Sequence, residues 1–254
     1  MSARTLPRMQ PAPVPTAPAD RRTLYEEILV VLSLSFLASV ASSILSLVES
    51  PIAGVVVASA NQSPLFGRQV LGFVFGLAPA FLVVHLLRRS GEGVGVIGLT
   101  LDKPRKDLLR GVVLALLVGT AGLGLYLAAV ELGVNRFVVP APPEGHWWTY
   151  VAVFMNPADA ALVEEVIVLG YLVTRLQQVG WSNGAAIGGS ALLRGGYHLY
   201  QGFGGFAGNL AMGLLFGWLF VHWRRTWPFV VAHFLLDVGA AIGWLLFREH
   251  LPGF

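Results

Sequence analysis

Long apolar runs separated by short polar segments dominate the chain from about residue 28 onward. Each run is close to the ~20 residues that an α-helix needs to cross the hydrocarbon core of a bilayer. The pattern therefore predicts an all-α, polytopic membrane helix bundle of about seven spans. The predicted spans are 28–48, 70–87, 109–132, 157–178, 184–200, 203–223 and 229–247.

The composition agrees with a membrane protein. Of the 254 residues, 55% are hydrophobic and only 12% are charged, and the mean hydropathy of +0.68 is far above that of soluble domains. The net charge is only +3, and no basic stripe interleaved with aromatic residues suggests nucleic-acid binding. The absence of cysteine excludes disulfides, thiolate zinc sites and cysteine nucleophiles. We therefore expect the lipid bilayer, and not nucleic acid, as a partner.

The first residues differ from the rest of the chain. Residues 1–22 are rich in proline and alanine and have no apolar periodicity, so they cannot bury a core. We expect them to form a disordered cytosolic tail. Residues 23–250 are expected to form a single transmembrane helical domain, because no second domain and no clear repeat is visible.

Basic residues are distributed unevenly between the two sides of the predicted membrane. With the N-terminus in the cytoplasm, most of the 17 lysines and arginines fall inside, and only Arg68, Arg136 and Arg248 fall outside. This distribution satisfies the positive-inside rule. We expect an integral membrane protein with a cytoplasmic N-terminus, and the compact form suggests a bacterial cell membrane. The loop 101–110 is expected inside and the loop 133–146 outside.

Ionisable residues also occur within three of the predicted spans. A charged side chain at the centre of a membrane helix costs roughly 2.5 to 3.5 kcal/mol, so such residues normally face a polar interior or a site. Their depths are compatible with one intramembrane polar site. The pairs are Glu164 and Glu165, Arg194 and His198, and His233 and Asp237. Asn209, six residues into a further span, is a candidate for lining the same site.

The helix that carries the two glutamates has recognisable ends in the sequence. Asn156 and Pro157 resemble a helix start, a capping residue followed by a first-turn proline. Gly180 resembles a helix end. We therefore expect this helix to begin at 156–157 and to close at Gly180.

Three motifs in the last third of the chain resemble those of a known family. They are the double glutamate Glu164-Glu165, the histidine His198 about thirty residues later, and the sequence from His233 to Asp237 with three residues between them. Together, over about 157–247, they resemble the CPBP family, the bacterial Abi relatives of the CAAX prenyl endopeptidase. Members of this family are intramembrane proteases.

The resemblance implies a catalytic assignment. Glu164 and His198 would activate a water for attack on a peptide bond, and His233 with Asp237 would stabilise the oxyanion; Glu165 belongs to the same motif. The chemistry is sensible in itself, since a base and preorganised donors are what peptide hydrolysis requires. The resemblance thus predicts an intramembrane endopeptidase acting on a peptide or a membrane protein.

Two positions depart from the family's usual pattern. Leu169 stands where the first motif usually has an arginine, and we expect Arg194, one turn before His198, to pair with Glu165 instead. Asp237 stands where an asparagine is common. An ionised carboxylate cannot donate a hydrogen bond, so Asp237 would either orient His233 or donate when protonated.

Other interpretations of the same residues remain open. Glu164, His198, His233 and Asp237 are all possible zinc ligands, although they lack the His-Glu-x-x-His spacing, and we favour a site without a metal cofactor. The glutamates and Arg194 could also form a purely structural ion pair. The alternative functions are a proteolytically inactive membrane scaffold or regulator of the same fold, and a proton-coupled transporter.

Overall fold

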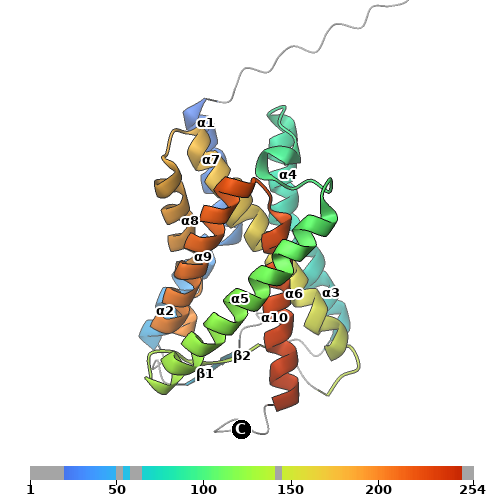
Figure 1. Cartoon of the computed structure of the whole chain (residues 1–254), viewed down its shortest axis with the longest axis vertical. Coiled ribbons are helices and arrows are strands. Elements are labelled where there is room, and N and C mark those ends of the chain that lie inside the picture. The colour runs from blue at the N-terminus through green and yellow to red at the C-terminus, as the bar shows by residue number, and fades with distance from the viewer. Residues whose placement is uncertain (1–19, 50–53, 58–64, 141–144, 248–254) are drawn as a thin grey trace, which may run out of the picture.

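The computed structural model describes residues 20–49, 54–57, 65–140 and 145–247. The tail predicted over 1–22 lies outside this range except for its last three residues, where Asp20 caps a helix that begins at Arg21. The described chain is mostly helical (Figure 1). The α-helices are α1 Arg21–Ser35, α2 Leu37–Glu49, α3 Phe66–Gly76, α4 Ala78–Arg89, α5 Pro104–Glu131, α6 Thr149–Glu164, α7 Leu172–Gln178, α8 Asn183–Tyr197, α9 Phe203–Trp223 and α10 Trp227–Phe247.

Shorter elements complete the fold. A π-helix, η2 Glu165–Tyr171, joins α6 to α7, and two 3-10 helices, η1 Val94–Ile97 and η3 Leu199–Gln201, lie in connections. The strands β1 Val55–Val57 and β2 Phe137–Val139 form a parallel pair. These strands were not part of the all-α prediction, and they lie in the connections between helices.

The number of spans is smaller than the sequence predicted. Within the described residues, four helical segments are long and apolar enough to cross a membrane, or five if a bent pair counts as one span. The predicted count of about seven is not confirmed. The four segments are Phe66–Arg89, Pro104–Glu131, Phe203–Trp223 and Trp227–Phe247, and the bent pair is α1 with α2.

Two predicted spans do not meet these criteria, and they carry Glu164, Glu165 and Arg194, whereas His233 lies in Trp227–Phe247, which does meet them. The helix α8 has 15 residues and ends at Tyr197, which gives a length of about 22 Å, short of the ~30 Å hydrocarbon core. The continuous helical segment from α6 to α7 contains Asp159, Glu164, Glu165 and Arg175 and is too rich in charge. Short length therefore excludes α8 as a typical membrane span, and its charged residues exclude the segment from α6 to α7.

The predicted start of the glutamate-bearing helix is wrong, whereas its predicted end is confirmed. The helix α6 begins at Thr149, and Pro157 lies inside it. The local capping signal of Asn156 and Pro157 is overridden because the apolar sequence upstream continues the helix, and membrane helices tolerate internal prolines that neighbouring helices support. At the other end α7 stops at Gln178, and Gly180 adopts a positive φ of 100°.

The first predicted span is bent rather than continuous. The helices α1 and α2 meet at an angle of 51° near Phe36. The Ser35 hydroxyl donates to the Val31 carbonyl at 2.7 Å, a back-bond that commonly bends helices. Beyond the bend, Phe36 stacks on Tyr197 of α8 with ring centroids 4.7 Å apart. The bend therefore brings the first span against the helix that carries His198.

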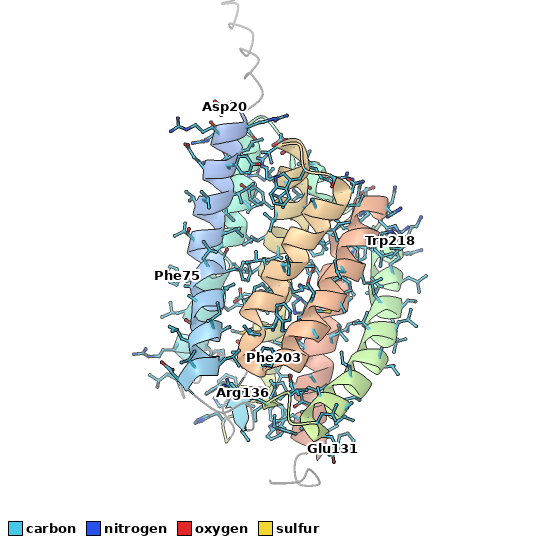
Figure 2. All side chains as sticks on the ribbon, turned by 90° about the vertical axis from the view of Figure 1, so that its left-hand side faces the viewer. Asp20, Phe75, Glu131, Arg136, Phe203 and Trp218 are labelled. Carbon is cyan, nitrogen blue, oxygen red and sulfur yellow. The ribbon has the colours of Figure 1, made fainter. Side chains whose placement is uncertain are left out.

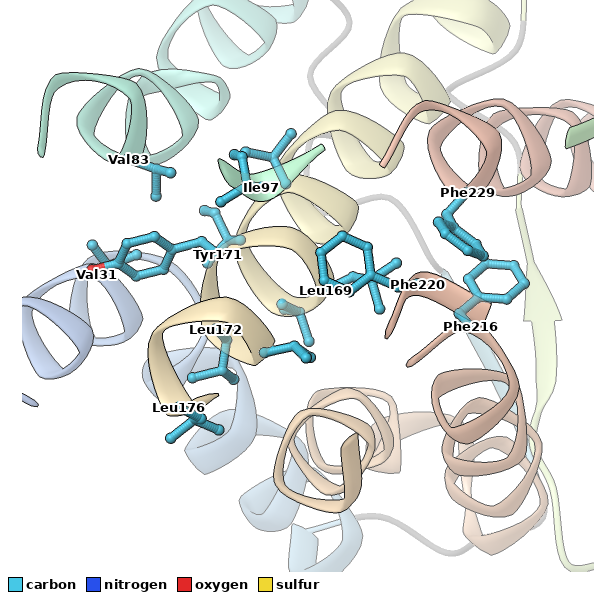
Figure 3. Close-up of a cluster of buried hydrophobic side chains, with 14 of the residues drawn as sticks. Val31, Val83, Ile97, Leu169, Tyr171, Leu172, Leu176, Phe216, Phe220 and Phe229 are labelled. Atoms are coloured by element: carbon cyan, nitrogen blue, oxygen red, sulfur yellow. The ribbon is translucent and has the colours of Figure 1, made fainter. Parts of the chain in front are cut away.

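The core of the protein surrounds η2. Every residue of η2 is buried, and Figure 3 shows Leu169 and Tyr171 between side chains of several other helices. On one side Tyr171 approaches Val31 and Val83, and on the other Leu169 faces the phenylalanines of α9 and α10. The segment that begins with Glu165 is thus buried among side chains of the neighbouring helices.

The molecule has two ends of different character. At one end, called here the basic end, α1, α5, α8 and α10 begin and α4, α7 and α9 finish (Figure 1). The opposite end, called here the sheet end, carries β1 and β2, with Arg136 and Glu131 visible there in Figure 2. Eleven described basic residues belong to the elements of the basic end: Arg21, Arg22, Arg88, Arg89, Lys103, Arg105, Lys106, Arg110, Arg175, Arg224 and Arg225.

Candidate functional site

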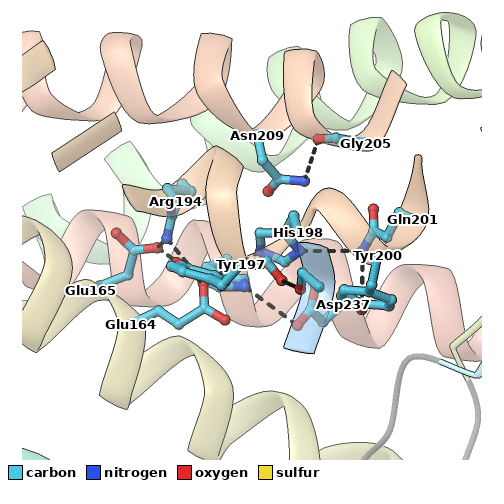
Figure 4. Close-up of polar contacts among 12 residues, drawn as sticks. Glu164, Glu165, Arg194, Tyr197, His198, Tyr200, Gln201, Gly205, Asn209 and Asp237 are labelled. Carbon is cyan, nitrogen blue, oxygen red and sulfur yellow. Dashed lines mark hydrogen bonds and ion pairs between the residues drawn. The ribbon is translucent and has the colours of Figure 1, made fainter. Parts of the chain in front are cut away.

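Four helical elements bring the predicted polar residues into one cluster (Figure 4). Glu164 ends α6, and Glu165 begins the π-helix η2. Arg194 lies in the last turn of α8, and His198 caps the end of that helix. His233 lies in α10. The structure therefore joins residues that are almost 70 positions apart in the sequence, because Glu165 and His233 contact each other directly.

The π-helix is supported from outside its own backbone. A π-helix interrupts the regular hydrogen bonds of an α-helix and is frequently found at functional sites. The hydroxyl of Ser190 in α8 donates to the carbonyl of Val168 at 2.6 Å, so a side chain from the neighbouring helix satisfies a carbonyl of η2. This contact also fixes α8 against the segment that carries the glutamates.

Glu165 is sealed inside the protein. Its side chain is 0% exposed, and its Oε1 accepts a hydrogen bond from Nη2 of Arg194. The same Oε1 lies 2.8 Å from Nδ1 of His233. Burying a carboxylate is tolerable only when it is paired and hydrogen-bonded, and these two partners supply that pairing at Oε1. The pairing of Arg194 with Glu165 that the sequence predicted is present, across a helix interface rather than within one helix.

Glu164 has a different environment from its neighbour. Its Oε2 accepts a hydrogen bond from the Tyr197 hydroxyl at 2.7 Å and one from Arg194 at 3.4 Å. Nε2 of His198 lies 3.7 Å from the same oxygen. The side chains of Glu164 and His198 are 13% and 17% exposed, so both are less completely buried than that of Glu165.

His233 lies between two carboxylates. Its Nδ1 faces Glu165, and its Nε2 lies 3.4 Å from Oδ2 of Asp237, one turn further along α10. The Asp237 side chain is 42% exposed, whereas that of His233 is 6% exposed. This geometry suits Asp237 to orient His233, the first of the two roles considered for it. A chain of contacts thus runs from Arg194 through Glu165 and His233 to Asp237.

Two members of the cluster were missed by the sequence analysis. Tyr197 donates to Glu164, and the side-chain amide nitrogen of Gln201 lies 3.2 Å from Nδ1 of His198. Tyr197 could have been found from its position, because it follows Arg194 by three residues and so shares its helix face. Gln201 could not, since it lies beyond the end of α8 in η3.

One predicted site residue does not join the cluster. The Asn209 amide donates to the Gly205 carbonyl of its own helix at 3.0 Å. Figure 4 shows this bond beside, and separate from, the contacts of the glutamates and histidines. Asn209 therefore lies near the site without bonding to the residues that form it.

The possible zinc ligands do not form a metal-binding set. Among the described residues, no group of three or more His, Asp or Glu side chains is arranged so that it could hold a metal ion. Glu164 lies beside His198, whereas His233 and Asp237 are linked to each other and to Glu165. The four candidates thus belong to two neighbouring pairs.

A comparison with known families places the site within one domain. Residues 146–239 match the family model for type II CAAX prenyl endopeptidase Rce1-like proteins. This segment is an Rce1-like domain of the CPBP family. The domain includes all the predicted site residues, from Glu164 to Asp237. No curated protein and no solved structure matches the chain.

The Rce1-like domain agrees with the resemblance seen in the sequence. The family is a family of proteases, so the match supports a hydrolase that acts on peptide or protein substrates in a membrane. The apolar helices outside the domain support an integral membrane protein. Both observations concern the class of the protein and not the chemical roles of individual residues in the cluster.

Proposed function

We propose that the protein is an intramembrane endopeptidase in which Glu164 and His198 activate a water molecule. One observation carries the proposal: of two adjacent glutamates in an Rce1-like domain, Glu165 is sealed by Arg194 and His233, whereas Glu164 stays partly exposed beside His198. A buried, paired carboxylate suits a structural role. An accessible carboxylate beside an imidazole suits a general base.

The proposed reaction is a hydrolysis whose protons are handled by Glu164. Water attacks the carbonyl carbon of the peptide bond while Glu164 takes its proton, which forms a tetrahedral oxyanion. Glu164 then passes the proton to the nitrogen of the leaving amine, and the carbon–nitrogen bond breaks to give a carboxylic acid and an amine. In a low-dielectric site, preorganised donors stabilise such an oxyanion strongly.

His233 is the proposed donor to the oxyanion. Its ring is held on one side by Glu165, at 2.8 Å, while the contact of Nε2 with Asp237, at 3.4 Å, is long for a hydrogen bond. We propose that His233 is an imidazolium with a hydrogen on both nitrogens, so that Nδ1–H donates to Glu165 and Nε2–H, which has only the long contact with Asp237, can donate to a substrate oxygen. Asp237 accepts and cannot donate when ionised, so its proposed role is to orient His233.

The name of the family suggests the first substrate to test. We propose a peptide or membrane protein as the substrate, and the family description points to a peptide with a prenylated C-terminal motif. A suitable probe is a fluorescence-quenched peptide that ends in prenyl-cysteine, two aliphatic residues and a variable residue. The same peptide without the prenyl group shows whether the lipid is needed for cleavage.

The decisive experiment compares cleavage by the wild type and by Glu164→Gln, both reconstituted in vesicles. The substitution keeps the shape of the side chain and removes its basicity, so kcat should fall roughly 10²- to 10⁴-fold. Glu26→Gln is the matched control, because Glu26 lies in α1 at the basic end, where it contacts only the exposed Arg22 among the ion pairs of the described residues. Full cleavage by folded Glu164→Gln would refute the proposed base.

The same assay separates the remaining alternatives. We propose that the reaction needs no metal, so a chelator should leave the rate unchanged; loss of cleavage that zinc restores would favour a metal enzyme instead. An inactive scaffold would cleave neither peptide, and a proton-coupled transporter would instead acidify or alkalinise the vesicle interior. The comparisons favour neither alternative.

A further inference from the structure

The turn that follows α8 presents His198 to Glu164, and it has a polar side chain of its own at the site. Gln201, the last residue of η3, places its amide nitrogen 3.2 Å from Nδ1 of His198 and 3.2 Å from the Tyr200 hydroxyl. An amide nitrogen carries two hydrogens and accepts none. The two contacts therefore use both donors of the Gln201 amide.

This contact bears on which nitrogen of His198 holds the proton. If the amide donates to Nδ1, then Nδ1 is the acceptor nitrogen of the neutral ring, and Nε2 carries the hydrogen. Nε2 is the nitrogen that lies 3.7 Å from the Glu164 carboxylate. His198 would then point a donor, rather than a basic lone pair, toward Glu164 and toward any water between them.

The backbone around Gln201 is held from two directions. Arg136, buried at the sheet end, donates from Nη1 to the Tyr200 carbonyl and from its backbone N–H to the Gln201 carbonyl, both at 2.7 Å. The Arg136 guanidinium also bonds Ser46 of α2, at 2.7 Å. A cation near the carbonyl end of a helix is favourable as well, because the helix dipole is negative there. The turn is thus tied to two other parts of the chain.

The Gln201 side chain is confined as well as the backbone. A Cβ atom at Gly205 would lie 2.6 Å from Cβ and 2.8 Å from Oε1 of Gln201, closer than real contacts allow. The backbone of α9 therefore packs directly against Gln201. Gly205 leaves the space in which the amide can face His198.

We propose that Gln201 is a positioning residue that holds the proton of neutral His198 on Nε2. The inference rests on the proposed function and divides the work of the proposed pair: Glu164 is the proton acceptor, and His198 is a hydrogen-bond donor that orients the attacking water. Loss of the correct imidazole tautomer can lower kcat by as much as about 10⁴-fold in well-studied hydrolases. Gln201 acts only through His198.

The direct test is a nitrogen NMR spectrum of the whole protein labelled at its histidines, with the His198 signals assigned by their loss in His198→Gln. Nδ1 of His198 should be the unprotonated nitrogen in the wild type. In Gln201→Glu the new carboxylate accepts from Nδ1–H, so the proton should appear on Nδ1. Gly205→Ala keeps Gln201 but places a methyl group in the space of its side chain. This variant should lower the fraction of His198 that carries its proton on Nε2. A protonated Nδ1 in the wild type, or no change in Gln201→Glu, overturns the proposal.

Kinetics supply the second readout. Gln201→Leu should lower kcat about 10- to 100-fold, as losses of partners that orient a histidine commonly do, with KM within about twofold of the wild type. Gln177→Leu is the matched control, because Gln177 bonds Asn183 and Arg224 at the basic end. A larger change in KM than in kcat would overturn the positioning role. If the wild type cleaves nothing, the proposed function fails, and the NMR result still decides whether Gln201 sets the tautomer.

Discussion

At the scale of single residues, the two adjacent glutamates show how neighbouring side chains acquire different properties. Glu165 is fully buried with two partners, whereas Glu164 is partly exposed and contacts Tyr197 and His198. Successive residues of a helix point about 100° apart, so one side chain enters the core while the other stays partly exposed. Two residues of the same type can therefore serve as a structural anion and as a base.

Arg194 should matter more for stability than for chemistry. Arg194→Leu leaves Glu165 without its cation in the core, so we expect the free energy of unfolding to fall by about 3 to 5 kcal/mol. The measurement is reversible unfolding in mixed detergent micelles. Arg22→Leu is the matched control, because the pair of Arg22 with Glu26 is exposed and such pairs contribute about 0 to 1 kcal/mol.

Equal stability of two arginine variants would contradict this prediction. If Arg194→Leu were as stable as Arg22→Leu, then the contact of Arg194 with Glu165 would not compensate for the burial of the carboxylate. Arg194 would then not take the place of the arginine that the family usually has at the position of Leu169.

At the scale of elements, a network of side chains at the basic end joins the loop after η1 to the start of α10. The Arg225 guanidinium pairs with Asp107 of α5 and with Asp102, and it donates to the Thr100 carbonyl at 2.9 Å. Thr226 bonds the end of η1 through its hydroxyl and its backbone N–H. The turn between α9 and α10 is thus fixed, and with it the start of the helix that carries His233.

Acid should weaken this network at one defined residue. The hydrogen bond from Thr100, and then the Arg225 guanidinium, lower the pKa of Asp102 from 3.8 to about 2. Because the pKa is lowered in the folded protein, the stabilisation is complete above about pH 4 and is lost as the pH falls toward 2. NMR titration of the Asp102 carboxyl carbon measures this directly.

Substitution of Arg225 provides the control for the titration. In Arg225→Gln the cation is gone while the Thr100 hydrogen bond remains, so the pKa of Asp102 should rise but stay below 3.8. A wild-type Asp102 that titrates near 3.8 would contradict the hydrogen-bonded arrangement of the loop.

At the scale of the whole molecule, the two ends differ in charge as the positive-inside rule would require. Most described basic residues lie at the basic end, and Arg68 and Arg136 belong to the sheet end. We expect the basic end in the cytoplasm. The orientation would place the start of α5 and the residues just before it inside, and the strand β2 outside.

The chain is well suited to a labelling test because it contains no cysteine. Lys106→Cys and Glu131→Cys introduce single thiols near the two ends of α5. In intact cells, a membrane-impermeant maleimide should label position 131 and should reach position 106 only after lysis. Labelling of both from outside, or of position 106 alone, would contradict the predicted topology.

Much of the site could be predicted from the sequence because its chemistry is local in origin. Charged residues in apolar runs are costly, so Glu164, Glu165, Arg194, His198 and His233 stood out and were expected to meet. Their clustering follows from the same cost, since each charge needs a partner. The class of membrane protein was equally visible, because hydrophobic runs depend on composition alone.

The sequence by itself determined the membrane class and the identity of the reactive groups, whereas the tertiary structure decided where elements start, bend and meet. The start of α6 at Thr149, the bend near Phe36 and the end of α8 at Tyr197 were not predicted from the sequence. Tyr197 and Gln201 acquire their roles only through contacts made after folding. The physical reason is that burial cost and periodicity are properties of a local segment, while the difference between Glu164 and Glu165 arises from neighbours contributed by other helices.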